Sequence, residues 1–133
     1  MSNMGTYPLA THGANQVVVS FSFVETTNAI ASARGWGVTS ITWVADGHYS
    51  IVFDKAYAAL ICSHVSVHTP ITTGDLTANH YELAYTQSTG TAVLKLLDGA
   101  NDIATSVPTD TRVNCTFTFA RFSTTGTGSI TLA

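Results

Sequence analysis

The chain has 133 residues and a formal net charge of −3, and only 10% of its residues are charged whereas 45% are hydrophobic. This length gives one domain with its own core rather than two. The negative charge argues against direct binding of nucleic acid, which needs a basic surface. No apolar run approaches the roughly 18 residues that span a bilayer.

Residues 1–14 are expected to form an N-terminal arm, because they are small and mostly polar and include Pro8. They have neither the basic nor the apolar region of a secretory signal, which predicts a protein made in the cytoplasm and used without Sec export. A terminal arm becomes ordered when a neighbour holds it. Tyr7 is the contact residue that we expect in this arm.

The predicted β-sandwich domain covers residues 15–122 and begins with a strand at 16–25. The two-residue period of a strand places alternate apolar side chains of this segment on one face. Residues 26–37 are expected to be a connecting loop, in which Trp36 stands between two glycines. An aromatic side chain in such a loop is suited to recognition, so Trp36 is a candidate partner contact.

Two alternating segments, 38–44 and 48–53, flank Asp46-Gly47. Asp-Gly between alternating segments predicts a β-hairpin, because a type I′ turn needs positive φ at both central residues.

Further strands are predicted at 57–69, 80–86, 91–98 and 111–122, with a C-terminal tail at 123–133. No segment has the 3.6-residue period of a substantial helix. Seven to eight strands separated by turn signals predict a single antiparallel β-sandwich of the jelly-roll type. In the tail, Ile130 and Leu132 are the candidate partner contacts.

The reactive side chains offer few sites. Cys62 and Cys115 could form one disulfide, but two free cysteines that are both buried as small apolar residues are the simpler interpretation in a protein that is not exported. His64 and His68 share a strand face about 13 Å apart, too far for one zinc ion. The oxygen-rich segment 98–102 lacks the ligand spacing of an EF-hand. We therefore predict no metal and no cofactor.

No catalytic motif is present, neither a nucleophile elbow nor a phosphate-binding loop nor a zinc-protease helix, so the protein is predicted not to be an enzyme. Exposed aromatic side chains could instead line a sugar-binding face. The candidates for such a face are Trp36, Trp43, Tyr49, Tyr57, Tyr81 and Tyr85.

The scarcity of lysine points to an assembly. Threonine is the most frequent residue, and the only lysines are Lys55 and Lys95. Free-standing β-proteins commonly guard their strand edges with charge, especially lysine. A chain without this protection is expected to have its edges or faces covered by other subunits.

Two segments support this expectation: "RGWGVTSITWVADGHYSIVFDKAYAAL" and "TAVLKLLDGANDIATSVPTDTRVNCTFTFARF". Together with the strand between them they span residues 34–122, and they resemble small all-β virion proteins of tailed bacteriophages. Such modules occur in capsid decoration (cement) proteins and in tail-fibre or spike tips. The chain shows only a short arm ahead of the module, without a long fibrous repeat, which favours decoration.

The resemblance implies a non-enzymatic structural protein on the capsid surface of the virion. Its partners would be the major capsid protein and copies of itself, expected as a homotrimer, with no direct contact to nucleic acid or membrane. One alternative is a receptor-binding tail tip that recognises a host surface glycan through Trp36. A second alternative is a cellular carbohydrate-binding or adhesion module.

Overall fold

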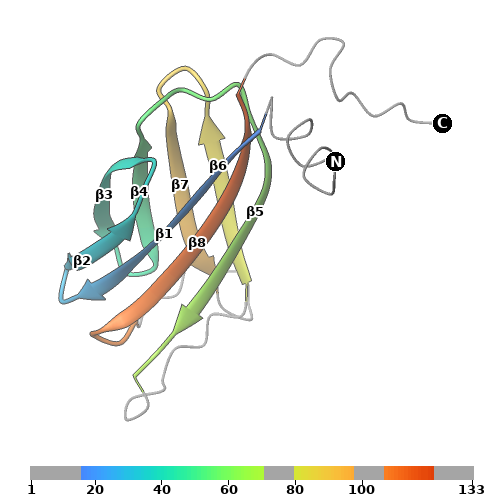
Figure 1. Cartoon of the computed structure of the whole chain (residues 1–133). Coiled ribbons are helices and arrows are strands. Elements are labelled where there is room, and N and C mark those ends of the chain that lie inside the picture. Colours follow the sequence, from blue (N-terminus) through green and yellow to red (C-terminus); the bar gives the residue numbers. More distant parts are fainter. Residues whose placement is uncertain (1–15, 71–79, 98–106, 122–133) are drawn as a thin grey trace, which may run out of the picture.

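The computed structural model describes residues 16–70, 80–97 and 107–121. Within these ranges the chain forms eight strands and no helix, so none of the described residues belongs to a helix that could span a membrane. The strands make two antiparallel four-stranded sheets (Figure 1), which confirms the predicted all-β sandwich. In chain order the strands are β1 (Gln16–Thr26), β2 (Ala29–Gly35), β3 (Val38–Ala45), β4 (His48–Phe53), β5 (Ala59–His68), β6 (His80–Thr86), β7 (Thr91–Leu97) and β8 (Thr111–Ala120).

The first sheet has the strand order β2-β1-β8-β5, and the second has the order β3-β4-β7-β6. Strands that follow each other in sequence pair as hairpins at β1–β2, β3–β4 and β6–β7. A hairpin forms at Asp46-Gly47 as predicted, and Trp43 pairs with Tyr49 across the turn. The turn is not of type I′, because Gly47 has a φ of 70° whereas Asp46 does not have a positive φ.

The loop predicted for residues 26–37 is wrong in its main part. Residues 29–35 form β2, which pairs with β1 after a tight turn at Thr27-Asn28, where Asn28 has a φ of 56°. Ile30 is half-buried and the rest of β2 is exposed. An exposed edge strand needs no apolar alternation, and alanine is depleted in strands, so this segment carries no strand signal in its sequence.

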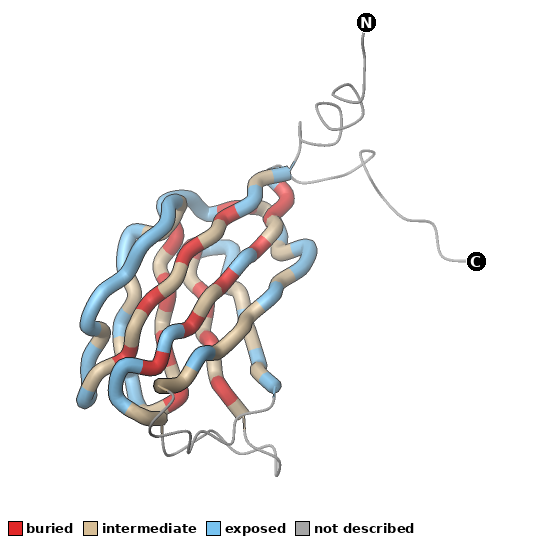
Figure 2. Tube along the Cα trace, turned by 60° about the horizontal axis from the view of Figure 1, so that its bottom comes forward, coloured by how far each residue is buried: buried red, intermediate tan, exposed pale blue. Residues whose placement is uncertain are grey.

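The core lies between the two sheets and is rich in aromatic rings. Buried and less buried residues alternate along β1, β4, β7 and β8, which Figure 2 shows as changing colour along the tube. This is the period-2 pattern of strands with one face in the core. The buried core residues are Val19, Phe21, Phe23, Tyr49, Ile51, Phe53, Tyr57, Ala92, Leu94, Leu96, Val113, Cys115, Phe117 and Phe119.

The pairing of β1 with β8 fixes where the outer segments of the chain attach. Gln16 pairs with Ala120, so segments 1–15 and 122–133 join the sandwich at the same end, called here the terminal end. At the opposite end, called the loop end, Glu25 pairs with Thr111. The turn at Asp46-Gly47 also lies at the loop end, since Tyr49, two residues after it, donates a hydrogen bond to Glu25.

Gly35 holds the end of β2 against β1. Its φ is 135°, and a Cβ there would collide with the carbonyl oxygen of Ser20 and lie 2.5 Å from Cα of Phe21. We expect Gly35→Ala to lower the free energy of unfolding by about 1–3 kcal/mol, because the backbone must move to remove this contact. Urea unfolding measures this loss. The control is Ser32→Ala at an exposed position of the same strand, and an equal loss in both variants would contradict the role of Gly35.

Candidate interaction surface

Trp36, the candidate contact in the described chain, lies in the connection between β2 and β3 and is 69% exposed. Its Nε1–H donates to the carbonyl oxygen of Val18 (3.4 Å), and its backbone N–H donates to that of Ser20 (3.3 Å). These two bonds place the indole beside the terminal half of β1. The other candidates, Tyr7, Ile130 and Leu132, lie outside the described residues, so their role stays a prediction.

An exposed apolar patch accompanies Trp36 at the terminal end of the first sheet. Val18 is 52% exposed, and its sheet row continues through Thr118 of β8 to the exposed Cys62 of β5. Ile61, the extra residue of the bulge in β5, is 49% exposed beside Cys62. We call Val18, Trp36, Ile61 and Cys62 the terminal patch.

The rest of the outer face of the first sheet carries short polar side chains. The next row across β1, β8 and β5 is Ser20, Thr116 and His64, in which the Ser20 and Thr116 hydroxyls lie 3.3 Å apart. The row after it contains Asn114 and Ser66, and Asn114 Nδ2–H donates to Ser66 Oγ (3.5 Å). Short hydroxyl and amide side chains make this face a broad surface for hydrogen bonding.

Arginine side chains join this face near its loop end. Arg34 of β2 lies beside Ser22 of β1, and Arg112 of β8 lies beside Val24 of β1; both arginines are exposed. His68 of β5 pairs with Arg112 and is also exposed. The positive charge of the face is therefore gathered over β2, β1 and β8.

The carboxylates of the described ranges lie elsewhere. Glu25 is buried, and Asp46 and Asp110 lie in turns at the loop end. Asp54 accepts a hydrogen bond from Thr39 Oγ1 (2.8 Å). Glu82 lies 3.9 Å from Lys95 across β6 and β7. The outer face of the first sheet thus combines arginine and histidine with no described carboxylate, although the chain is acidic as a whole.

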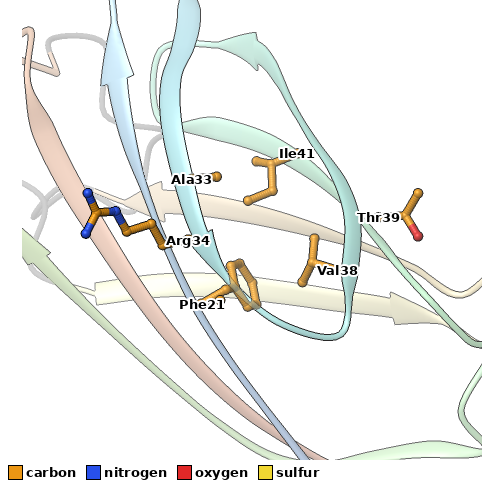
Figure 3. A pocket seen from close by; sticks show the side chains of 7 residues that line it. Phe21, Ala33, Arg34, Val38, Thr39 and Ile41 are labelled. Carbon is orange, nitrogen blue, oxygen red and sulfur yellow. The ribbon is translucent and has the colours of Figure 1, made fainter.

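A small pocket of about 140 Å³ lies where the edges of β2 and β3 meet (Figure 3). Its apolar lining includes Phe21, Val38 and Ile41, whereas the polar ends of Arg34 and Thr39 point away from it. Because no polar group of these side chains converges inside, the pocket offers no catalytic arrangement.

Glu25 is an unusual feature of the core, since this ionisable residue is only 1% exposed. Tyr49 Oη–H donates to Glu25 Oε1 (2.7 Å). Burial raises the pKa of Glu25; the Tyr49 hydrogen bond opposes this rise, and the charge of Asp46 adds to it. The Nε1–H of Trp43 is buried near the same carboxyl and has no hydrogen-bond partner among the described residues.

The aromatic residues considered for a sugar-binding face do not form one. Tyr49 is fully buried and Tyr57 is buried against Phe119, with ring centroids 4.8 Å apart. Tyr81 and Tyr85 are half-buried and donate hydrogen bonds to the carbonyl oxygens of Ser63 (3.1 Å) and Tyr57 (2.8 Å), respectively. Trp43 packs against the core. Of this set, Trp36 alone is largely exposed.

The cysteines are both free, as the simpler interpretation expected. Cys115 is buried in β8, and this burial raises the pKa of its thiol to about 12. Cys62 is exposed, so the expectation that both cysteines are buried is wrong for this residue.

The histidines His64 and His68 lie on the outer face of β5. Across the described ranges, no three His, Cys, Asp or Glu side chains gather where they could hold a metal ion. Segment 98–102 lies outside the described residues.

Two features of the site were missed from the sequence. Glu25 continues the inward alternation of Phe21 and Phe23, so the period of two could have identified it as a buried carboxyl. The approach of Arg34 to Arg112 depends on the order and register of three strands, for which the sequence carries no local signal.

Comparison with known proteins gives no relative: no family model, no curated protein and no solved structure matches this chain.

Proposed function

We propose that this protein is a non-enzymatic structural protein that decorates the head of a tailed bacteriophage, with the outer face of the first sheet placed on the major capsid protein. The observation that carries the proposal is this face itself. It is broad, its side chains are short, and it has exposed apolar residues at one end and arginines near the other. The sequence resemblance over residues 34–122 supplies the link to phage virions.

The face alone is too small for a standard interface, so attachment through it needs further contacts. A four-stranded sheet with strands of about eight residues presents roughly 500 Å², which is less than the ≈800 Å² per partner of a standard protein interface. Segments 1–15 and 122–133 leave from the terminal end, beside the terminal patch, and we propose that they supply the remaining contacts on adjacent subunits. Repetition of weak contacts over a shell gives strong attachment by multivalency.

The edge strands support assembly with further copies of the chain, which we propose to be a trimer. Strands β2, β3, β5 and β6 are the sheet edges, and among their residues only Arg34 and Glu82 carry a full charge. Uncharged edges of free-standing sheets invite pairing with other chains. Cover by neighbouring copies removes this hazard.

Particles prepared with and without the protein test the proposal. We expect added protein to bind the heads in a fixed copy number and to raise the temperature at which they rupture. The reason is that each bound copy adds an interface that must break before subunits separate. Equal rupture temperatures for both preparations would refute the decoration role.

A receptor-binding tail tip is the second candidate, favoured by the 69% exposure of Trp36. This function predicts that the isolated protein adsorbs to host cells or to their surface glycans and that Trp36→Ala abolishes the adsorption. A decoration protein would bind heads and leave cells unlabelled.

A further inference from the structure

Arg34 and Arg112 lie on either side of β1 and line one pocket of about 110 Å³ on the outer face of the first sheet. We name this pocket the arginine site; its lining also includes Ser22, Val24 and Ser32. Arg34 is next to Ser22 across the β1–β2 pairing, and Arg112 is next to Val24 across the β1–β8 pairing. The two side chains therefore reach the same pocket from the two strands that flank β1.

Neither guanidinium takes part in an ion pair within the part of the chain that the structure describes, where Lys95–Glu82 is the one ion pair. The five cationic side chains of the chain include only three others, Lys55, Lys95 and Arg121. Two exposed arginines that line one pocket with Ser22 and Ser32 and form no ion pair with a described carboxylate make a surface that favours an anion.

From this arrangement we infer that the arginine site binds a side-chain carboxylate on an acidic surface of the partner protein. The planar guanidinium forks bind a carboxylate through paired hydrogen bonds, and the hydroxyls of Ser22 and Ser32 offer further donors. The inference rests on the proposed function, because it specifies the chemistry of the partner surface that the first sheet contacts.

The dimensions of the site favour a protein carboxylate over an acidic sugar. A pocket of about 110 Å³ is well below the ≈300–1,000 Å³ of sites that enclose a small-molecule ligand. Its lining presents no exposed aromatic ring as a stacking platform, since Phe23 is buried at 1% exposure. A single carboxylate reaching down from a flat partner surface fits both facts.

The experiment uses the full chain and poly-L-glutamate as the probe, titrated at low ionic strength and followed by NMR chemical shifts. We expect shifts at Arg34, Arg112 and their strand neighbours, and weaker binding as salt is added. The double variant Arg34→Gln/Arg112→Gln should bind at least about tenfold more weakly. The double lysine variant Arg34→Lys/Arg112→Lys keeps the charge and should recover only part of the affinity, because lysine lacks the fork.

The matched control is Lys55→Gln/Lys95→Gln, which removes the same charge from other surfaces and should bind poly-L-glutamate as the unmodified chain does. Ser32→Asp places a carboxylate at the site and should abolish binding even if the arginine variants misfold. Three results would each overturn the inference: no binding, equal weakening in the control, or tighter arginine-dependent binding of polygalacturonate. Arginine-dependent self-association in the absence of a probe would also overturn it, because the occupant would then be a second copy.

The two proposals can fail separately. Binding of poly-L-glutamate at the arginine site without binding to phage heads would refute only the decoration role. Unchanged binding of heads by the double glutamine variant would refute only the arginine site.

Discussion

Phe119→Ala is expected to lower the free energy of unfolding by about 3–5 kcal/mol, the usual cost of removing a buried phenylalanine ring. Phe119 is fully buried. Its ring centroid lies 4.8 Å from those of Phe53 and Tyr57 and 5.0 Å from that of Tyr85. The ring therefore joins β8 of the first sheet to β4 of the second sheet, to β6 and to the segment after β4.

The expected loss exceeds that of an ordinary surface change because a cavity would open between the two sheets and several ring contacts would be lost together. Domains of this size are commonly stable by about 5–15 kcal/mol, so urea unfolding should show a large decrease in the midpoint. Phe119→Leu should lose less, because it leaves a smaller cavity.

Thr118→Ala is the matched control, one residue away on the outer face and expected to change stability by no more than about 0.5 kcal/mol. A loss from Phe119→Ala as small as that of Thr118→Ala would show that the rings do not hold the sheets together.

Glu25→Gln is expected to remove a pH dependence of stability that the unmodified protein has. The folded-state pKa of Glu25 is raised above its ordinary value of 4.5, chiefly by burial. The stability that its protonated form contributes is complete below about pH 4.5 and is lost as the pH rises through the folded-state pKa. Glutamine has no proton to lose, and its carbonyl oxygen can still accept the hydrogen bond from Tyr49.

The measurement is urea unfolding of both proteins between about pH 4 and pH 8. Their difference isolates Glu25 from the other titrating groups. We expect the glutamine variant to gain stability relative to the unmodified protein as the pH rises. A gain by the unmodified protein over the same range would require a lowered pKa and would contradict the burial argument.

Tyr49→Phe tests the same pair from the other side. It removes the hydroxyl that donates to Glu25 Oε1 and leaves the ring of Tyr49 against Phe23, 4.9 Å away. An unsatisfied buried group costs about 1–3 kcal/mol, and more when it is charged. The loss should therefore be greater at pH 8 than at pH 4.

The strands that could be predicted from the sequence are those with one face in the core. Val113, Cys115, Phe117 and Phe119 alternate with polar residues, and β8 follows this pattern closely. Burial of every second side chain imposes that alternation, so it is visible without a structure. Strand β2 has no such constraint, because as an exposed edge strand it contributes only Ile30 to the packing around the core.

The candidate site depends on longer-range information. Trp36 could be singled out by its flanking glycines, which mark a loop. The arginine site could not, because Arg34 and Arg112 come together only when β8 pairs with β1 on the side opposite β2. The packing of the whole core decides which distant strands pair, and local sequence patterns carry no information about that pairing.

The pairing of Gln16 with Ala120 has a mechanical consequence. A force that pulls the two chain ends apart would separate β1 from β8 one residue pair at a time, starting at Gln16 and Ala120. Only the backbone hydrogen bonds of one pair would resist this force at any moment. A force between one chain end and the outer face of the first sheet would instead be shared by many backbone hydrogen bonds at once. A sandwich attached only through its two chain ends would therefore unfold under a small force. Attachment through the outer face of the first sheet would let it resist a larger one.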